Sequence, residues 1–362
     1  MQKSLYYEFT QKNFPGLVTE IVEKLNEKRN NALPYLYREL LTPTFSADGR
    51  WASVLAEYTR VAADIVSLDS ELPLKSRDSL QTAQGEIPKM GLKLYLSEKQ
   101  MKDIDAMVAQ QYPFPMIARK IFEDTPRVIE AIYERIEDIF LSELSTGVGL
   151  STNNNGTGTR VDVGYLASHK FGVAVLWNDV ENSTPIDDIQ RVFDQAMEDQ
   201  NVITDVWMDD YALNKLYKSK QVRAQYAFDA GVSMAAGAVA PVLDYDKASQ
   251  VLMTKWGITT HRVARKIKTE INGKKQNHSP WQEGMVIFTC DTILGDLVWS
   301  TVAEATRKVA NVDYQTADDF ILVSKYSLVD PLREFTASQA MVLPVINNVD
   351  RIYQLDSKTV QS

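Results

Sequence analysis

Residues 64–96 contain two stretches in which every second residue is apolar or small, and this pattern constrains the fold most strongly. The members are Val66, Leu68, Ser70, Leu72 and Leu74 in the first stretch, and Met90, Leu92, Leu94 and Leu96 in the second. Such alternation predicts extended strands with one apolar face. Residues 77–86 (RDSLQTAQGE) lie between them and predict a polar tip too long for a two-residue turn. Because a lone hairpin is marginally stable, its apolar stripe has to rest on another surface.

Two segments predict amphipathic helices. Residues 15–29 place Leu17, Ile21 and Leu25 on one stripe. Residues 125–146 repeat apolar side chains every three or four positions, and Thr125, Pro126 and Gly147 stand where a cap, a first helical residue and a terminator are expected. The opposite side of this second helix carries Glu130, Glu134, Glu137 and Asp138. We interpret these as a solvated or subunit-facing surface, because no histidine that could complete a metal site lies nearby.

The following segments predict a mixed α+β fold. Residues 147–165 are rich in Gly and Asn but lack the Lys-Ser/Thr ending of a phosphate-binding loop, so they favour a hairpin turn. Residues 171–218 then read as strand, helix, strand and helix, with Thr184 and Pro185 at the start of the first helix.

Residues 261–278 form a basic segment around an Asn-Gly pair. Asn272 and Gly273 are the strongest short signal for a two-residue hairpin turn. The basic residues are Arg262, Arg265, Lys266, Lys268, Lys274 and Lys275. A nucleic-acid patch is one interpretation, but no aromatic residues interleave to stack on bases. We favour a solvated hairpin whose charges meet acidic partners.

The composition excludes several classes of protein. No apolar run reaches the length of a membrane-spanning helix, and the N-terminus lacks the layout of a secretion signal. A net charge of −9 disfavours a protein whose main task is to bind DNA, although an acidic shell could enclose DNA without adhering to it. The single cysteine, Cys290, lies in an apolar stretch and is expected to be a buried thiol.

No catalytic constellation is recognisable, so we expect no catalytic residue, cofactor or metal. The three histidines, His169, His261 and His278, lack metal-ligand spacing. Three acidic pairs, at 187–188, 209–210 and 318–319, stand at expected helix starts or turns, where carboxylates bind backbone amides or complement the helix dipole. A carboxylate-based hydrolase is therefore unsupported.

The segment DPLREFT, residues 330–336, resembles the closing segment of the phage lambda major capsid protein family. Its members in this chain are Asp330, Pro331, Arg333, Glu334, Phe335 and Thr336. Residues 271–288 (INGKKQNHSPWQEGMVIF) are similar to the family's Asn-Gly hairpin and Met-Val stretch, and residues 184–190 (TPIDDIQ) are similar to the helix start that opens its axial domain. The order of elements extends the resemblance over nearly the whole chain.

The resemblance implies the Hong Kong 97-like capsid fold. Its expected parts are an N-terminal arm at 1–59, an extended hairpin called the E-loop at 60–101, a spine helix and peripheral domain at 102–183, an axial domain at 184–329 and a returning peripheral strand at 330–362. The E-loop stripe, Arg333 and Glu334 are then expected at contacts between subunits.

The implied function is that of a structural protein of the virion. Many copies would assemble in the host bacterial cytoplasm into pentamers and hexamers of an icosahedral head around double-stranded DNA. A separate scaffolding protein, a portal and possibly a decoration protein would be partners, and no membrane would be involved. Two alternatives remain open at this point, an encapsulin-like compartment shell and a cytoplasmic α/β enzyme.

Overall fold

The computed structural model describes residues 2–26, 34–56, 80–152, 158–231, 241–271 and 274–361. The chain divides into two compact units, and each unit is formed by three segments that are separated in the sequence. The first unit comprises Met1–Trp51, Gln84–Phe140 and Asp296–Val345, and the second comprises Ala52–Ala83, Leu141–Gly295 and Ile346–Ser362.

The first unit is built on a six-stranded sheet. Its strands are β1 (Leu41–Phe45), β4 (Lys89–Leu96), β13 (Gly295–Ser300), β14 (Asp313–Ala317), β15 (Ile321–Val329) and β16 (Leu332–Ile346). The order is β1-β13-β16-β15-β14, and β4 pairs with the long strand β16. The helices are α1 (Tyr7–Asn26), α2 (Tyr37–Leu40), α3 (Glu98–Ala109), α4 (Phe114–Ile121) and α10 (Ala303–Thr306).

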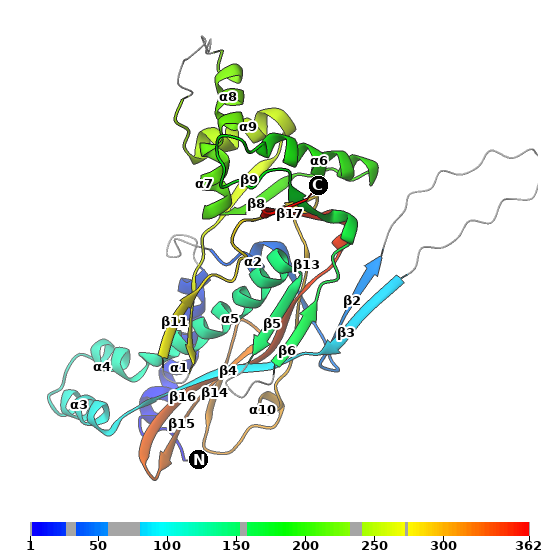
Figure 1. Cartoon of the computed structure of the whole chain (residues 1–362). Helices are drawn as coiled ribbons and strands as arrows, with labels where there is room; N and C mark the ends of the chain where they lie inside the picture. The colour runs from blue at the N-terminus through cyan, green and yellow to red at the C-terminus, as the bar shows by residue number, and fades with distance from the viewer. Residues whose placement is uncertain are drawn as a thin grey trace, which may run out of the picture. The chain divides into compact units, whose positions relative to one another are not determined.

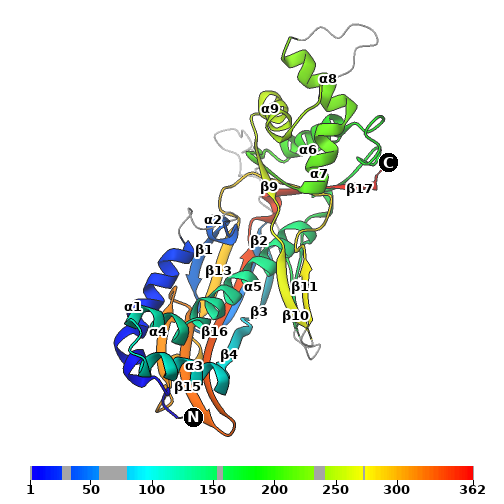
Figure 2. The same ribbon diagram turned by 90° about the vertical axis from the view of Figure 1, so that its left-hand side faces the viewer.

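Helix α5 (Asp124–Thr146) confirms the predicted long helix, and it ends at Gly147, whose φ is +78°. The predicted apolar stripe is fully buried: Ile129, Ile132, Ile136, Ile139 and Phe140 are each at most 1% exposed. The Ser338 hydroxyl of β16 donates a hydrogen bond to the Val128 carbonyl at 2.6 Å, so α5 lies against the first sheet (Figure 2).

Two predictions about α5 are wrong. Thr125 lies inside the helix and its buried hydroxyl has no hydrogen-bond partner among the described residues, so it is not the cap. The expectation of a solvated or subunit-facing acidic side is wrong for Glu137 and Asp138, which are buried, whereas Glu130 and Glu134 are partly exposed. Glu137 accepts hydrogen bonds from the backbone N–H groups of Leu36 and Tyr37, at 3.0 and 3.2 Å, and thereby holds the segment before α2.

The N-terminal helix is longer than predicted. It begins at Tyr7, well before residue 15, and Pro15 lies within it. Its buried residues are Thr10, Phe14 and Val18, which follow one another at four-residue spacing. The predicted stripe of Leu17, Ile21 and Leu25 is only partly buried.

The second unit contains a five-stranded sheet in the order β7-β17-β12-β8-β9. The strands are β7 (Lys170–Val173), β8 (Asp205–Asp209), β9 (Thr259–Val263), β12 (Met285–Thr289) and β17 (Ile352–Val360). Its helices are α6 (Pro185–Glu198), α7 (Asp210–Lys218), α8 (Lys220–Asp229) and α9 (Tyr245–Trp256), with short 3-10 turns at Ala167–His169 and Val349–Arg351. The four helices lie on one side of the sheet (Figure 1). The predicted strand-helix-strand-helix order over 171–218 is thus confirmed by β7, α6, β8 and α7.

Three further strand pairs are hairpins or ribbons. β5 (Val148–Thr152) pairs with β6 (Gly158–Asp162), which confirms the hairpin predicted in the glycine-rich segment. β10 (Ile267–Ile271) pairs with β11 (Lys274–His278). β2 (Arg50–Ala56) pairs with β3 (Leu80–Glu86).

The position of β3 corrects the predicted E-loop hairpin. Residues 80–86 were expected in its polar tip, yet they form a strand, and the strand paired with them begins at Arg50, before the expected boundary at residue 60. The sequence LQTAQGE has no apolar alternation, so no local pattern predicts this strand, and its pairing with β2 shows it.

Strand pairing also divides the chain differently from the expected domains. Residues 296–329 were expected with 184–295, but β14 and β15 join β16 in the first sheet. Residues 346–362 were expected with the preceding returning strand, but β17 pairs with β7 and β12 in the second sheet.

A buried carboxyl near the end of α5 makes stability depend on pH. Glu143 is fully buried, neither carboxylate oxygen has a hydrogen-bond partner among the described residues, and burial raises its pKa well above the ordinary value. The pKa of Glu143 is raised only in the folded state, where burial favours the protonated carboxyl. The contribution of this group to the free energy of unfolding is therefore complete below the unfolded-state pKa and is lost as pH rises toward the folded-state pKa.

We therefore expect Glu143→Gln to become progressively more stable than the wild type as pH rises from 4 to 8. Urea unfolding of the unassembled chain at several pH values measures this difference. Glu198→Gln, the same change on an exposed residue, is the matched control. Parallel profiles for the wild type and Glu143→Gln would contradict the assignment.

Candidate interaction surfaces

The second apolar stretch of the predicted hairpin, which contains Met90, Leu92, Leu94 and Leu96, belongs to the sheet of its own unit. β4 pairs antiparallel with β16, from Leu96 opposite Glu334 to Lys89 opposite Met341. Leu96 is only 5% exposed, Met90 and Leu94 are partly buried, and Leu92 is 37% exposed. Of the four, Leu92 offers the most surface to another molecule.

The first apolar stretch, Val66, Leu68, Leu72 and Leu74, lies outside the described residues. Its expected contact with a neighbouring subunit stays a prediction.

Glu334 of the DPLREFT segment is buried within its own unit and does not lie on an exposed interface. It is fully buried, as is Lys325 on the neighbouring strand β15, and the Nζ of Lys325 lies 3.7 Å from Glu334 Oε1. The other carboxylate oxygen accepts the backbone N–H of Leu5 at 3.0 Å, and the Ser4 hydroxyl donates to Oε1. This carboxylate therefore fastens the N-terminal segment to the sheet.

Arg333 lies beside this network but is partly exposed. Its guanidinium stands over the ring of Tyr95 in β4, 4.2 Å from the ring centroid. Tyr95 is itself 46% exposed, so Arg333 and Tyr95 form an accessible surface on the first sheet.

Lys325 is the functional residue that the sequence analysis missed. It donates hydrogen bonds to the Ile121 carbonyl at 3.1 Å and to the Thr336 hydroxyl at 3.2 Å. The available signal was its place within the apolar run ILVSKYSLV, where a lysine on a buried strand needs a carboxylate partner.

Asn272 and Gly273 lie outside the described residues, but the strands on either side of them are described. Ile271 pairs with Lys274, and the antiparallel register continues to Ile267 opposite His278. The hairpin itself is thus present. In the described part of the hairpin, Ile267 is buried and Lys266, Lys268, Lys274 and Lys275 are exposed.

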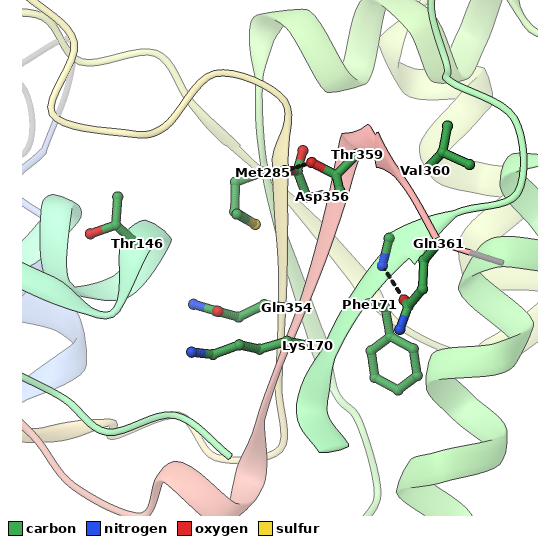
Figure 3. Close-up of a pocket in the computed structure, with 10 residues that line it drawn as sticks. Thr146, Lys170, Phe171, Met285, Gln354, Asp356, Thr359, Val360 and Gln361 are labelled. Carbon is green, nitrogen blue, oxygen red and sulfur yellow. Dashed lines mark hydrogen bonds between the residues drawn. The ribbon is translucent and has the colours of Figure 1, made fainter. Parts of the chain in front are cut away.

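An open pocket of about 450 Å³ lies in the second unit beside β7 and β17. Figure 3 shows Lys170 and Gln354 projecting in the same direction, while Gln361 reaches back to accept a hydrogen bond from the backbone N–H of Gly172. Its remaining side chains include Met285 and Asp356. The Thr359 hydroxyl donates a hydrogen bond to Asp356 at 2.7 Å, and no histidine or cysteine is among the described residues that line the pocket.

The titratable groups singled out in the sequence occupy structural positions. Burial raises the pKa of the Cys290 thiol to about 12, which keeps it protonated. His169 is buried against Tyr353, with Nε2 3.1 Å from Asp199 Oδ2. His261 stacks on Trp207, with Nε2 2.7 Å from Asp205 Oδ1.

Among the described residues, no group of three or more His, Cys, Asp or Glu side chains could hold a metal. None of the described helices is long and apolar enough to cross a membrane.

Comparison with known proteins identifies the chain's relatives. The family described as phage major capsid protein E matches residues 54–357. No curated protein matches. Among solved structures, a prophage capsid protein from E. coli CFT073 is similar with a TM-score of 0.58 at 15% identity, covering 98% of this chain and 99% of that one. A phage-related protein from Bordetella bronchiseptica RB50 is similar with a TM-score of 0.51 at 11% identity, covering 94% and 96%. These likenesses in structure extend over almost the whole of each chain.

Proposed function

Because this chain belongs to the phage major capsid protein E family, it is a shell protein of the virion, and we propose that its copies form the pentamers and hexamers of an icosahedral phage head. The observation that carries this proposal is the family match over residues 54–357, which spans both units. The family is a structural one. The match favours neither an encapsulin-like compartment nor a cytoplasmic α/β enzyme.

The two units correspond to the parts that such a shell needs. In the proposal, the first unit is the peripheral domain, the second is the axial domain, α5 is the spine helix and the β2–β3 hairpin begins the E-loop. Their support is the topology: a long buried helix on one sheet, and a separate sheet covered by helices on one side. These assignments replace the expected boundaries at residues 60, 183 and 329.

Further partners follow from the same function. A head assembled from this chain would need a portal, would enclose DNA without sequence-specific contacts, and would use a separate scaffolding protein and an optional decoration protein. The net charge of −9 supports non-adhesive enclosure of DNA.

The test of this function is particle formation by the full chain. Expressed alone or with its phage's assembly proteins, it should give closed shells of megadalton mass in negative-stain micrographs and light scattering. Only small soluble species under all these conditions would contradict the proposal.

Substitutions at Leu92 and Leu96 can distinguish an effect on assembly from an effect on folding. Both residues lie on β4, but Leu92 is 37% exposed and Leu96 is 5% exposed. We expect Leu92→Ser to leave the melting of the unassembled chain unchanged and to weaken the shell, since burying a leucine at a contact stabilises by about 1.5–3 kcal/mol. Leu96→Ser should instead destabilise the subunit itself by about 2–5 kcal/mol, as large-to-small changes in cores do. Thermal melts of subunits and particles distinguish these outcomes, and a Leu92→Ser subunit that melts as early as Leu96→Ser would remove Leu92 from the interface.

A further inference from the structure

Charge is segregated along the second unit to a degree that its fold does not require. Residues 171–210 contain ten acidic residues and one basic residue, whereas residues 211–275 contain twelve basic and four acidic residues. The two stretches follow one another in the chain, and each supplies helices to the same layer over the second sheet.

The acidic stretch is displayed on α6. Asp187, Asp194 and Glu198 recur at seven and four residues, are all exposed, and lie opposite the buried side of the helix formed by Ile189 and Val192. No ion pair within the described residues neutralises these three carboxylates. Asp187 and Asp194 accept hydrogen bonds only from the neutral side chains of Gln221 and Gln190, each at 2.8 Å.

Four residues of the basic stretch, Lys215, Lys218, Lys247 and Lys255, lie on α7 and α9, which also carry Asp210 and Asp246. Lys218 and Lys255 are exposed and Lys215 is partly exposed. In the described structure each stands over an aromatic ring of its own helix, those of Tyr217, Trp256 and Tyr211, and none pairs with a carboxylate. Their charges are therefore available to a partner.

These two surfaces lie over opposite edges of one sheet. α6 packs against β7 and β17, while α7 packs against β8 and β9 and α9 packs against β9. β7 and β9 are the two edge strands of the five-stranded order. The three carboxylates of α6 without an ion pair in the described structure therefore lie over one edge of the sheet, and Lys215, Lys218 and Lys255 lie over the other.

We propose that the partner of each charged surface is the opposite surface of a second copy, so that Lys215, Lys218 and Lys255 of one subunit face Asp187, Asp194 and Glu198 of the next. Contact of either edge with the same edge of a second copy, across a two-fold axis, would bring like charges together, which repels. A head-to-tail contact between opposite edges joins unlike charges, and its repetition gives a ring when the rotation between subunits closes. The inference rests on the proposed function, which requires such rings, and adds which surfaces of the subunit join.

The test is a charge swap in the full chain. Lys215→Glu/Lys218→Glu/Lys255→Glu should lower particle yield at least about tenfold, because each contact then sets like charges opposite one another. Adding Asp187→Lys/Asp194→Lys/Glu198→Lys to the same chain restores complementary surfaces, and yield should return to within about threefold of wild type. Lys12→Glu/Lys99→Glu/Lys102→Glu, on exposed lysines of the first unit, has the same net charge change and should assemble normally.

Each outcome has one meaning. If the wild type forms no shells, the proposed function fails. If the wild type assembles and the triple reversal on α7 and α9 assembles equally well, the pairing is overturned. Loss of assembly without rescue by the swap also overturns it, because the basic surface then serves another molecule such as DNA or a separate protein. Melting curves of the unassembled variants establish that each subunit is folded, and the wild-type rings should also weaken with added salt, as the screening length falls from about 10 Å at 0.1 M to about 3 Å at 1 M.

Discussion

Glu334→Ala is expected to destabilise the subunit by about 3–5 kcal/mol, the usual cost of leaving one member of a buried ion pair without its partner. The Lys325 ammonium and the Glu334 carboxylate are both fully buried. Alanine would leave the ammonium with only its hydrogen bonds to Ile121 and Thr336, and would also leave the Ser4 hydroxyl and the Leu5 N–H without their acceptor. Urea unfolding of the unassembled chain, with a protease digest to detect release of the N-terminal segment, measures both effects.

We expect the Lys325–Glu334 pair to specify the arrangement of these segments more than it stabilises the folded state. Burial lowers the pKa of Lys325 and raises the pKa of Glu334, so desolvation outweighs the mutual attraction for each group. Lys325→Met/Glu334→Gln removes both charges; the amide oxygen can accept the Leu5 N–H, and the amide N–H₂ can donate to the Ser4 hydroxyl oxygen. We expect this double variant to recover most of the stability lost in Glu334→Ala.

Arg333→Ala is the matched neighbouring control. It removes a partly exposed cation–π contact with Tyr95, which contributes about 0.5–1 kcal/mol. If Glu334→Ala costs no more than Arg333→Ala, the carboxylate is not a buried clamp.

The contrast between Arg333 and Glu334 shows what the sequence can and cannot predict. Both residues stand in one motif, and the motif indicates the family but not which side chain is buried. That depends on Lys325, Ser4 and Leu5, which come from distant parts of the chain and are brought together only by the sheet.

Periodic patterns in the sequence predicted the structure correctly where the pattern arises within a single helix or strand. The apolar stripe of α5 and the strand-helix-strand-helix order after residue 170 follow from spacing within single elements, and both were predicted correctly. The partner of β4 is β16, which lies more than two hundred residues away, so no local pattern could indicate it. The same reason explains β3, a polar strand that exists through its pairing with β2.

The acidic pair at 187–188 is a second case in which the sequence does not indicate which of two neighbouring residues is buried. Asp187 and Asp188 were both expected to complement the start of a helix. In the structure Asp187 is exposed, whereas Asp188 is 1% exposed and accepts three hydrogen bonds.

Asp188→Ala is expected to destabilise the second unit by about 2–5 kcal/mol, because each buried donor left unpaired costs about 1–3 kcal/mol. The carboxylate accepts the backbone N–H of Ala174 at 3.0 Å, the indole N–H of fully buried Trp177 at 2.9 Å, and a guanidinium N–H of Arg191 at 3.0 Å. It thereby ties the segment after β7 to α6. Urea unfolding followed by intrinsic tryptophan fluorescence, to which Trp177 is one of six contributors, measures the loss.

Two further substitutions test whether the hydrogen bonds of Asp188 account for the loss of stability. Asp187→Ala, at the adjacent exposed position, removes a helix-dipole contact and a hydrogen bond from Gln221, and should cost less than about 1 kcal/mol. Asp188→Asn keeps one oxygen acceptor but turns an amide N–H₂ toward the remaining donors, so its stability should fall between those of wild type and Asp188→Ala. Equal losses for the changes at 187 and 188 would show that burial of the second carboxylate is not what holds this segment in place. The alternative result is a loss of stability only for changes at 188, smaller for Asp188→Asn than for Asp188→Ala. It would show that aspartate is required at this position for its three hydrogen bonds and not for the helix dipole.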